Sequence, residues 1–173
     1  MSIRLANITD ASSLAALSLE VWLGTYIREG INGFFADYAL AEFTAQNFET
    51  ILQNQDERIY VSDNTIGIDG FIRISSKHIT DIKGCSDTEI ATLYVQARHQ
   101  GKQIGKQLLT TGLEYCTKIS AMTPWLAVNS ENPIAINFYL ANGFKKIGRT
   151  RFKIQNQSYL NEVLAIKLPP NET

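Results

Sequence analysis

The sequence predicts an α/β or α+β fold in which a central mixed sheet of about seven strands is flanked by four helices. Three observations support this prediction. Segments with strand and helix periodicity follow one another in the order β-α-α-β-β-β-α-β-α-β-β. The segment Glu89–Val95 is almost continuously apolar, as in a strand that is covered on both faces. The 173 residues contain no repeat and no linker, so we expect one domain spanning residues 1–173.

The N-terminal half of the chain is expected to contain a short strand, two helical regions and a β-hairpin. Thr9 or Asp10 caps the first helix, and a break at Gly24–Gly33 separates it from the second helical region. Thr44 is a candidate internal cap that would divide this second region into two helices. The strands expected here span residues 3–5, 58–62 and 66–75, and the second helical region spans residues 34–53.

The C-terminal half is expected to form a strand-helix-strand crossover, one further helix and two closing strands. The crossover should be right-handed. Pro133 in the first turn and Gly143 at the end delimit the helix that follows it. The crossover comprises residues 89–95, 103–118 and 125–129, and the closing strands span residues 144–154 and 159–168 around a turn at residues 155–158.

The composition favours a globular protein and argues against several functional classes. Apolar residues make up 45% of the chain, charged residues 19%, and the net charge is −1. A general nucleic-acid binder would carry a basic excess, and no apolar run is long enough to cross a membrane. Cys85 and Cys116 lack metal-site spacing, and two isolated thiols suit a reducing compartment. We therefore expect a cytoplasmic protein that binds no metal, nucleic acid or membrane.

A short glycine-containing loop, Q-G-K-Q-I-G at residues 100–105, follows the apolar strand and opens a helix. Backbone N–H groups at a helix N-terminus have no partner within the helix and bind anions. Gly101 and Gly105 permit a close approach of the backbone, while Lys102 and Lys106 add positive charge. The loop matches neither a nucleotide P-loop nor the dinucleotide fingerprint. We expect it to bind the pyrophosphate of a bulky cofactor; the alternative is an ordinary helix start.

A second stretch, N-P-I-A-I-N-F-Y-L-A-N-G-F from Asn132 to Phe144, follows the second strand of the crossover. It places Tyr139 on a short helix. Two interpretations remain open for this residue. Its hydroxyl either takes part in chemistry, or it belongs to a packed aromatic side chain that finds some hydrogen-bond partner.

Together the two stretches resemble the GCN5-related N-acetyltransferase family. The resemblance lies in L-Y-V followed by Q-G-K-Q-I-G-K-Q-L-L, and in N-x-x-A-I-x-F-Y-x-x-x-G-F about two dozen residues later. The order of elements resembles the family over residues 3–168. This implies a mostly antiparallel sheet that is splayed at the cofactor site. W-L-G-T-Y and A-D-Y-A-L-A-E-F-T are also similar to the small bacterial polyamine acetyltransferases of the PaiA type.

The resemblance implies that acetyl-coenzyme A is the acetyl donor. The family loop reads Gln/Arg-x-x-Gly-x-Gly/Ala, so Gln100 and Gly105 match and Gln103 replaces the middle glycine. Gln103 can still donate its backbone N–H to the pyrophosphate if its φ is negative. Asn132 and the backbone of the strand are expected to hold the pantetheine arm, and Tyr139 to lie beside the sulfur. The implied cofactor-binding residues are Leu93, Tyr94, Val95, Gln100, Gly101, Lys102, Gln103, Ile104, Gly105, Lys106, Asn132 and Tyr139.

Two side chains are candidates for the proton transfers of an acetyl transfer. An alkylammonium of pKa ~10.4 must lose a proton before it attacks, which costs about 4–5 kcal/mol at pH 7. Glu89 is the candidate base because it aligns with a glutamate of the histone-type family members; a salt bridge at the strand end, or a water chain acting as base, is the alternative. The leaving thiolate needs less help, and Tyr139 is the candidate acid. His78 and His99 are expected to have no catalytic role.

The acceptor is expected to be a polyamine or another small cationic amine. Six acidic residues and no lysine or arginine lie between Glu29 and Glu57, and such a field attracts cations. Trp22 and Tyr26, four residues apart on one helix face, either line the acceptor pocket or belong to the core. A protein N-terminus or lysine is the alternative acceptor, and a non-catalytic coenzyme A-binding regulator is the alternative of another class. Exposed sheet edges invite pairing, so a homodimer is a reasonable assembly.

Overall fold

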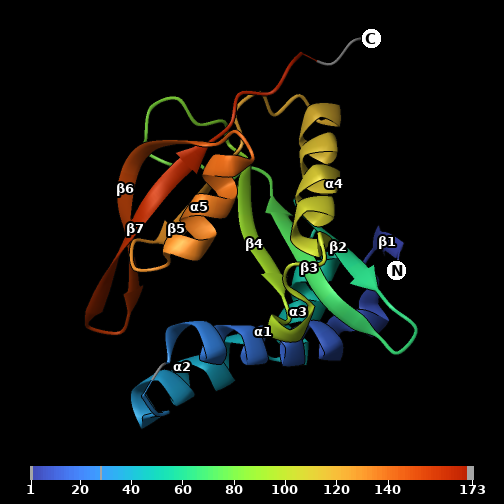
Figure 1. Ribbon diagram of the computed structural model, residues 1–173, viewed down its shortest axis with the longest axis vertical. Coiled ribbons are helices and arrows are strands. Elements are labelled where there is room, and N and C mark those ends of the chain that lie inside the picture. The colour runs from blue at the N-terminus through green and yellow to red at the C-terminus, as the bar shows by residue number, and fades with distance from the viewer. Residues whose placement is uncertain (1, 28, 171–173) are drawn as a thin grey trace. The chain divides into compact units, whose positions relative to one another are not determined.

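The computed structural model describes residues 2–27 and 29–170, in which seven strands and five α-helices are present (Figure 1). The strands are β1 (Ser2–Leu5), β2 (Glu57–Asp63), β3 (Ile68–Ser75), β4 (Glu89–Val95), β5 (Trp125–Asn129), β6 (Lys145–Ile154) and β7 (Gln157–Ala165). The α-helices are α1 (Ala11–Tyr26), α2 (Gly33–Glu42), α3 (Ala45–Gln53), α4 (Ile104–Lys118) and α5 (Pro133–Ala141). The strand order is β1-β2-β3-β4-β5-β7-β6. The parallel pairing of β4 with β5 and the antiparallel pairs β1–β2, β5–β7 and β6–β7 confirm the predicted mixed sheet.

The prediction of four helices is wrong, because the second helical region forms two. Phe43 leaves the helical conformation after α2, and Thr44 caps α3 by accepting a hydrogen bond from the N–H of Asn47 (3.1 Å). The candidate internal cap at Thr44 is therefore confirmed. The expected break at Gly24 is also wrong, since α1 continues to Tyr26. In the closing hairpin, β7 begins at Gln157, so the connection is shorter than expected.

The chain divides into two compact units, whose boundary passes through β4 and α4. Unit 1 comprises residues 1–74 and 92–112, and unit 2 comprises residues 75–91 and 113–173. Glu89 of β4 pairs with Trp125 of β5 within unit 2. The splay at the cofactor site and the single domain remain predictions.

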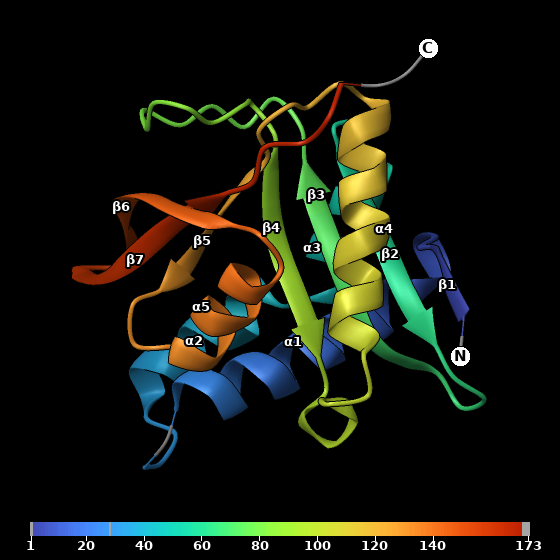
Figure 2. The same cartoon turned by 45° about the horizontal axis from the view of Figure 1, so that its top comes forward.

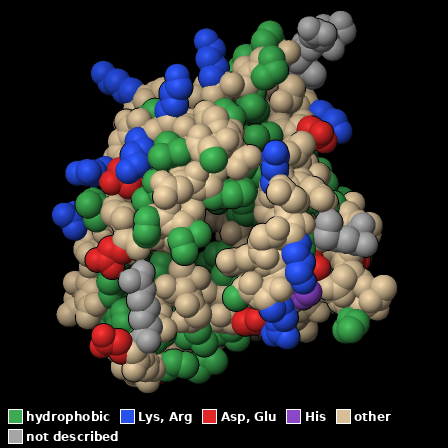
Figure 3. Space-filling view, viewed as in Figure 1, with side chains coloured by type: hydrophobic (Ala, Val, Ile, Leu, Met, Phe, Trp, Pro, Cys, Tyr) green, Lys and Arg blue, Asp and Glu red, His purple; other side chains and the backbone are tan. Residues whose placement is uncertain are grey.

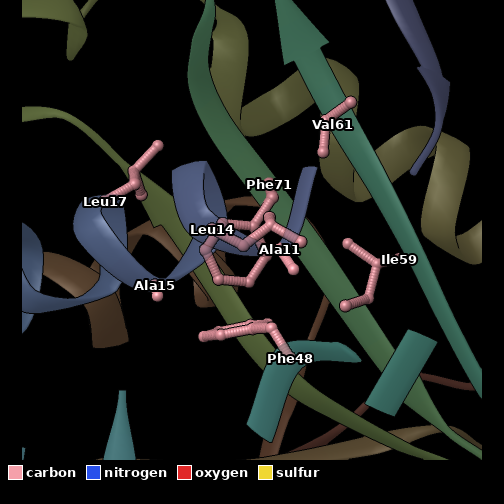
Figure 4. Close-up of a cluster of buried hydrophobic side chains, with 8 residues drawn as sticks. All are labelled: Ala11, Leu14, Ala15, Leu17, Phe48, Ile59, Val61 and Phe71. Atoms are coloured by element: carbon pink, nitrogen blue, oxygen red, sulfur yellow. The ribbon is translucent and has the colours of Figure 1, made fainter. Parts of the chain in front are cut away.

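The core of unit 1 lies between helices α1 and α3 and one face of strands β2 and β3 (Figure 4). Phe48 of α3 meets Phe71 of β3 edge to face, with ring centroids 6.0 Å apart. Because side chains alternate along a strand, the neighbours of Phe71 point to the opposite face. There Ile72 and Ile74 lie against Gly112 of α4, where an added Cβ would come within 2.7 Å of the Ile72 side chain. Strand β3 is therefore covered on both faces.

A cluster of charged side chains around Asp10 connects the first elements of unit 1. The carboxylate of Asp10 accepts hydrogen bonds from both terminal nitrogens of Arg4 (2.7 and 2.9 Å) and from the backbone N–H of Asn7 (2.8 Å). Asp63 of β2 pairs with the Nε of the same arginine. The hydrogen bonds from Arg4 lower the pKa of Asp10, although burial acts against this. The cluster ties β1 to the first helical turn and to β2.

We expect Asp10→Asn to lower the free energy of unfolding by about 1–3 kcal/mol at pH 7, because a buried charge-assisted pair is lost. The lowered pKa makes this stabilisation fully present above the unfolded pKa of about 3.9 and removes it as pH falls through the folded pKa. Urea unfolding at pH 7 and near pH 3 measures both effects. Asp63→Asn, at the more exposed partner, should cost less. An equal loss at both pH values would contradict this account.

Unit 2 is built on the antiparallel strands β5, β7 and β6, with helix α5 beside β5 and β7 in both views (Figures 1 and 2). Trp125 faces Ala165 across the β5–β7 ladder, and Val163 packs with both. Ile82, in the loop before β4, packs on this cluster, and its side chain closely approaches Gly148 of β6. The 76–88 loop is thereby held against the sheet of unit 2.

The outer strand β6 is largely exposed and strongly basic. It carries Lys145, Lys146, Arg149, Arg151 and Lys153, and Figure 3 shows Lys and Arg side chains gathered on the side where β6 lies. Charged side chains on an edge strand discourage pairing with another chain. The homodimer remains a prediction. Among the described residues, no helix has the length and apolar character needed to cross a membrane.

Candidate active site

The glycine-containing loop of unit 1 is folded back onto the end of β4. A short 3₁₀ helix, Ala97–His99, follows the strand, and the Gln100 side chain donates to the carbonyl of Val95 (3.3 Å). Gly101 then takes a positive φ of 76°. The Gln100 side chain therefore connects the loop to the last residue of β4.

The start of α4 presents backbone donors on this loop. The N–H of Gln107 bonds to the carbonyl of Gln103 (3.0 Å). The N–H groups of Ile104, Gly105 and Lys106 precede that bond, and the positive end of the helix dipole coincides with them. Lys102 and Lys106 are exposed beside these donors. N–H groups and cations of this kind can bind a pyrophosphate, and the pyrophosphate site at this loop remains a prediction.

Gln103 departs from the sequence expectation in its backbone. Its φ is +65°, whereas the expected donation to pyrophosphate was tied to a negative φ. Gln103 directly precedes α4, and Gly101 two residues earlier also has a positive φ. Glutamine thus adopts a conformation that favours glycine at the position where the family pattern has glycine. A left-handed conformation costs a residue with a Cβ about 1–2 kcal/mol.

We expect Gln103→Val to destabilise the loop by a further ~1–2 kcal/mol, because a β-branched side chain tolerates positive φ poorly. Gln103→Gly should leave stability nearly unchanged or raise it by up to about 1 kcal/mol, since relief of strain is partly offset by glycine's freedom when unfolded. Urea unfolding and calorimetric titration with coenzyme A measure both variants. Gln107→Val, one turn further along α4, is the matched control and should cost about 0.5 kcal/mol. Equal losses for the two valine variants would contradict the strain at Gln103.

A side chain from α1 braces the same loop. Glu20 accepts hydrogen bonds from the Gln96 amide (2.6 Å) and from Arg98 (3.2 Å). The bond from Gln96 is the main cause that lowers the pKa of Glu20. Arg98 is thus paired with a carboxylate, while Lys102 lies 3.4 Å from the ring of His99. The first turn after β4 is held by α1 rather than by its own residues alone.

The last residues of β4 belong to unit 1 and are only partly buried. Tyr94 packs edge to face on Phe71, with ring centroids 5.7 Å apart, so its side chain belongs to the unit 1 core. The carbonyl of Val95 accepts from Gln100, and the N–H of Gln96 bonds to Asp69 (3.0 Å). The pairing of Leu93 and Val95 with a pantetheine arm remains a prediction.

Two predicted residues lie on α5 of unit 2. Asn132 caps this helix, its side-chain oxygen accepting from the N–H of Ala135 (3.1 Å). Because the oxygen is used by the cap, the amide nitrogen is the group suited to donate to a ligand. Tyr139 is 8% exposed and meets Phe138 and Phe144 edge to face. Its ring is therefore held rigidly by packing.

A cavity of about 380 Å³ lies within unit 2, and the candidate base is among the residues that line it. Glu89, at the start of β4, lines this cavity together with Asp81, Arg151 and Asn161. Trp125, paired with Glu89 in the parallel ladder, forms part of the wall. Its buried indole N–H has no hydrogen-bond partner among the residues that the structure describes. The cavity therefore combines two carboxylates with an aromatic wall.

His78 is a member of this site that sequence reasoning missed. Its Nδ1 lies 3.5 Å from a carboxylate oxygen of Glu89, and its ring meets Trp125 with centroids 5.6 Å apart. The polar loop at 76–88 carries no motif that could have indicated this. The backbone N–H of His78 also bonds to the carbonyl of Asp87 across this loop (2.7 Å).

Trp22 and Tyr26 belong to an aromatic cluster in unit 1. Trp22 is 6% exposed, and its ring lies 5.2–6.2 Å from those of Tyr26, Phe35, Tyr38 and Phe43. Burial raises the pKa of Tyr26, and burial with the nearby Glu42 raises that of Tyr38 to about 12. These contacts support core packing for Trp22; an acceptor role for the pair remains a prediction.

Comparison with known proteins agrees with the fold and the motifs. The family model described as the acetyltransferase (GNAT) family matches residues 27–144. A spermidine N(1)-acetyltransferase of Thermoplasma acidophilum is 23% identical over 147 residues, covering 84% of this chain and 88% of that protein. The crystal structure of the PaiA N-acetyltransferase of the same organism, in complex with coenzyme A, superposes with a TM-score of 0.75 at 21% identity over 97% of this chain and 100% of that one. A GCN5-related N-acetyltransferase from Rhodopseudomonas palustris gives a TM-score of 0.76 at 15% identity over 96% and 95%. The chain therefore belongs to the GCN5-related N-acetyltransferase (GNAT) family and is an acetyl-coenzyme A-dependent N-acetyltransferase.

Proposed function

We propose that the enzyme acetylates a polyamine or another small cationic amine by direct attack. The observation that carries this proposal is the unit 2 cavity, where Glu89 and Asp81 place two carboxylates beside the aromatic wall of Trp125. Carboxylates and an aromatic face are the groups that bind an ammonium ion. The acidic stretch from Glu29 to Glu57 and the spermidine acetyltransferase among the distant relatives support the same acceptor class.

The proposed cofactor residues divide by the part of coenzyme A that each would hold. The N–H groups of Gly101 and those at the start of α4 bind the pyrophosphate, with Lys102 and Lys106 supplying charge. Gln103 is left out of the donor set, because its φ is positive. The backbone of Leu93–Val95 and the Asn132 amide bind the pantetheine arm. Acetyl-coenzyme A supplies the acetyl group as a thioester. The residues of this chain supply the positioning and the two proton transfers.

Glu89 is the proposed base and Tyr139 the proposed acid. Glu89 accepts the proton of the acceptor ammonium, which frees the nitrogen lone pair for attack. The hydroxyl of Tyr139 donates a proton or hydrogen bond to the departing thiolate. An acetyl-cysteine intermediate is disfavoured, because burial raises the pKa of the Cys116 thiol to about 12 and also raises that of Cys85. Raised pKa values leave little thiolate to act as nucleophile.

Two competing functions are separated by one assay, the release of free thiol from acetyl-coenzyme A. The acceptors are spermidine, spermine and putrescine, compared with peptides that present an N-terminal amine or a lysine. Release with polyamines is the expected result. Release with peptides alone would instead assign a protein acetyltransferase. If no acceptor leads to thiol release and calorimetry shows that coenzyme A binds, the protein would be assigned as a non-catalytic regulator.

A further inference from the structure

We infer that His78 is a positioning residue that pairs with Glu89 and carries the acceptor proton from the cavity to solvent. This inference rests on the proposed base Glu89. It concerns a histidine in a loop without a motif, held to the carboxylate by tertiary structure.

The geometry pairs Glu89 with a histidine whose side chain is the more exposed to solvent. Its Nδ1 is 3.5 Å from Oε2 of Glu89, which is ion-pair range and longer than a good hydrogen bond. Catalytic hydrogen bonds are commonly long without substrate and shorten when it binds. The Glu89 side chain is 16% exposed, whereas that of His78 is 54% exposed. A proton on Glu89 therefore has a titratable neighbour that reaches solvent.

Two contacts hold His78 in place besides its pairing with Glu89. The backbone N–H of His78 donates to the carbonyl of Asp87, which closes the loop just before β4. The ring stands edge-on to Trp125, which β5 holds opposite Glu89 in the parallel ladder. Trp125 is itself 4% exposed and packed in the unit 2 core. The ring is thus supported by β5 of unit 2 besides its own loop.

The proton balance explains what His78 adds. The N–H bond of the acceptor ammonium breaks as an O–H bond forms on Glu89. The neutral carboxyl then transfers this proton to Nδ1 of His78, and the imidazolium releases a proton from Nε2 to water. Imidazole is a stronger base than a carboxylate, so it can accept the proton from the neutral carboxyl.

Three charged side chains line the same cavity as His78. Glu89 comes from β4, Asp81 from the loop that carries His78, and Arg151 from β6. The other strands that line the cavity contribute Trp125 and Ala127 from β5 and Asn161 from β7, which carry no charge.

The kinetic test compares single and double variants of the full-length enzyme with its best amine acceptor. His78→Gln is expected to lower kcat at least about 10-fold near pH 7 and to leave KM for acetyl-coenzyme A within twofold. Glu89→Gln combined with His78→Gln should be no slower than Glu89→Gln alone, because the two residues act as one path. Added imidazole should restore part of the rate to His78→Ala and none to Glu89→Gln. Lys83→Gln, an exposed change in the same loop, is the matched control and should keep the wild-type rate.

A second measurement keeps the inference testable whatever the acceptor proves to be. The chain has two histidines, so NMR titration resolves both rings, and His99→Gln assigns them. The ring resonances of His78 should shift when Glu89→Gln changes the group that lies 3.5 Å from Nδ1, while those of His99 should not. Unchanged His78 ring resonances, wild-type kcat in His78→Gln across the pH range, or multiplicative losses in the double variant would each overturn the inference. Failure of every amine as acceptor would count against the proposed function, while the NMR spectra would still decide the pairing.

Discussion

Replacing Tyr139 by phenylalanine is expected to lower kcat about 100-fold or more, with little change in KM for acetyl-coenzyme A. General acid catalysis by a positioned side chain contributes typically 10²- to 10⁴-fold. The change removes only the hydroxyl. The ring should keep its edge-to-face contacts with Phe138 and Phe144, so α5 should retain its packing. The loss is therefore expected in the chemical step. Steady-state kinetics from pH 6 to pH 10 measure it.

Tyr115→Phe is the matched control, since it removes a tyrosine hydroxyl from α4 in the same unit without touching α5. It should leave kcat within about twofold, and both variants should unfold at nearly the wild-type urea concentration. A Tyr139→Phe enzyme with wild-type kcat at every pH would show that Tyr139 is a packed aromatic without a part in the chemistry. A large loss of stability in that variant alone would mean that the hydroxyl has a structural partner.

Local sequence patterns predicted the order of strands and helices along the chain and the loop that opens α4, because caps, glycines and apolar periodicity act over a few residues. Thr44 could be read as a cap since its side chain bonds three residues ahead. Backbone conformation at a non-glycine residue could not be read in this way. The positive φ of Gln103 belongs to the turn between Gly101 and α4. A glutamine at position 103 does not by itself predict this conformation.

The cavity around Glu89 could not be predicted from local sequence patterns, for a different reason. Its residues come from the loop before β4 and from β4, β5, β6 and β7, and they meet only through strand pairing. The sequence identified Glu89 by alignment with a family motif. It gave no reason to favour His78, because the contact with Glu89 forms only in the folded chain. Side chains that meet only through tertiary structure have no characteristic spacing in the sequence from which their contact could be predicted.

Replacing Glu89 by glutamine is expected to reduce kcat/KM about 10²- to 10⁴-fold near neutral pH, the range that a general base contributes. Glutamine has nearly the same shape, so the β4–β5 pairing and the cavity should persist. Without the carboxylate, the variant depends on the small fraction of acceptor that is already neutral. That fraction rises tenfold with each pH unit up to the amine pKa of about 10.4. The defect should therefore be greatest below about pH 8 and shrink steadily at higher pH.

The shape of the pH profile separates a base from a binding group. Asp81→Asn removes another carboxylate from the same cavity and should raise KM for the amine without changing the slope of kcat against pH. A Glu89→Gln profile that runs parallel to wild type would assign Glu89 to acceptor binding and leave a water chain as the base. A profile that converges with wild type near the amine pKa is expected, because at that pH the acceptor no longer needs a protein group to remove its proton.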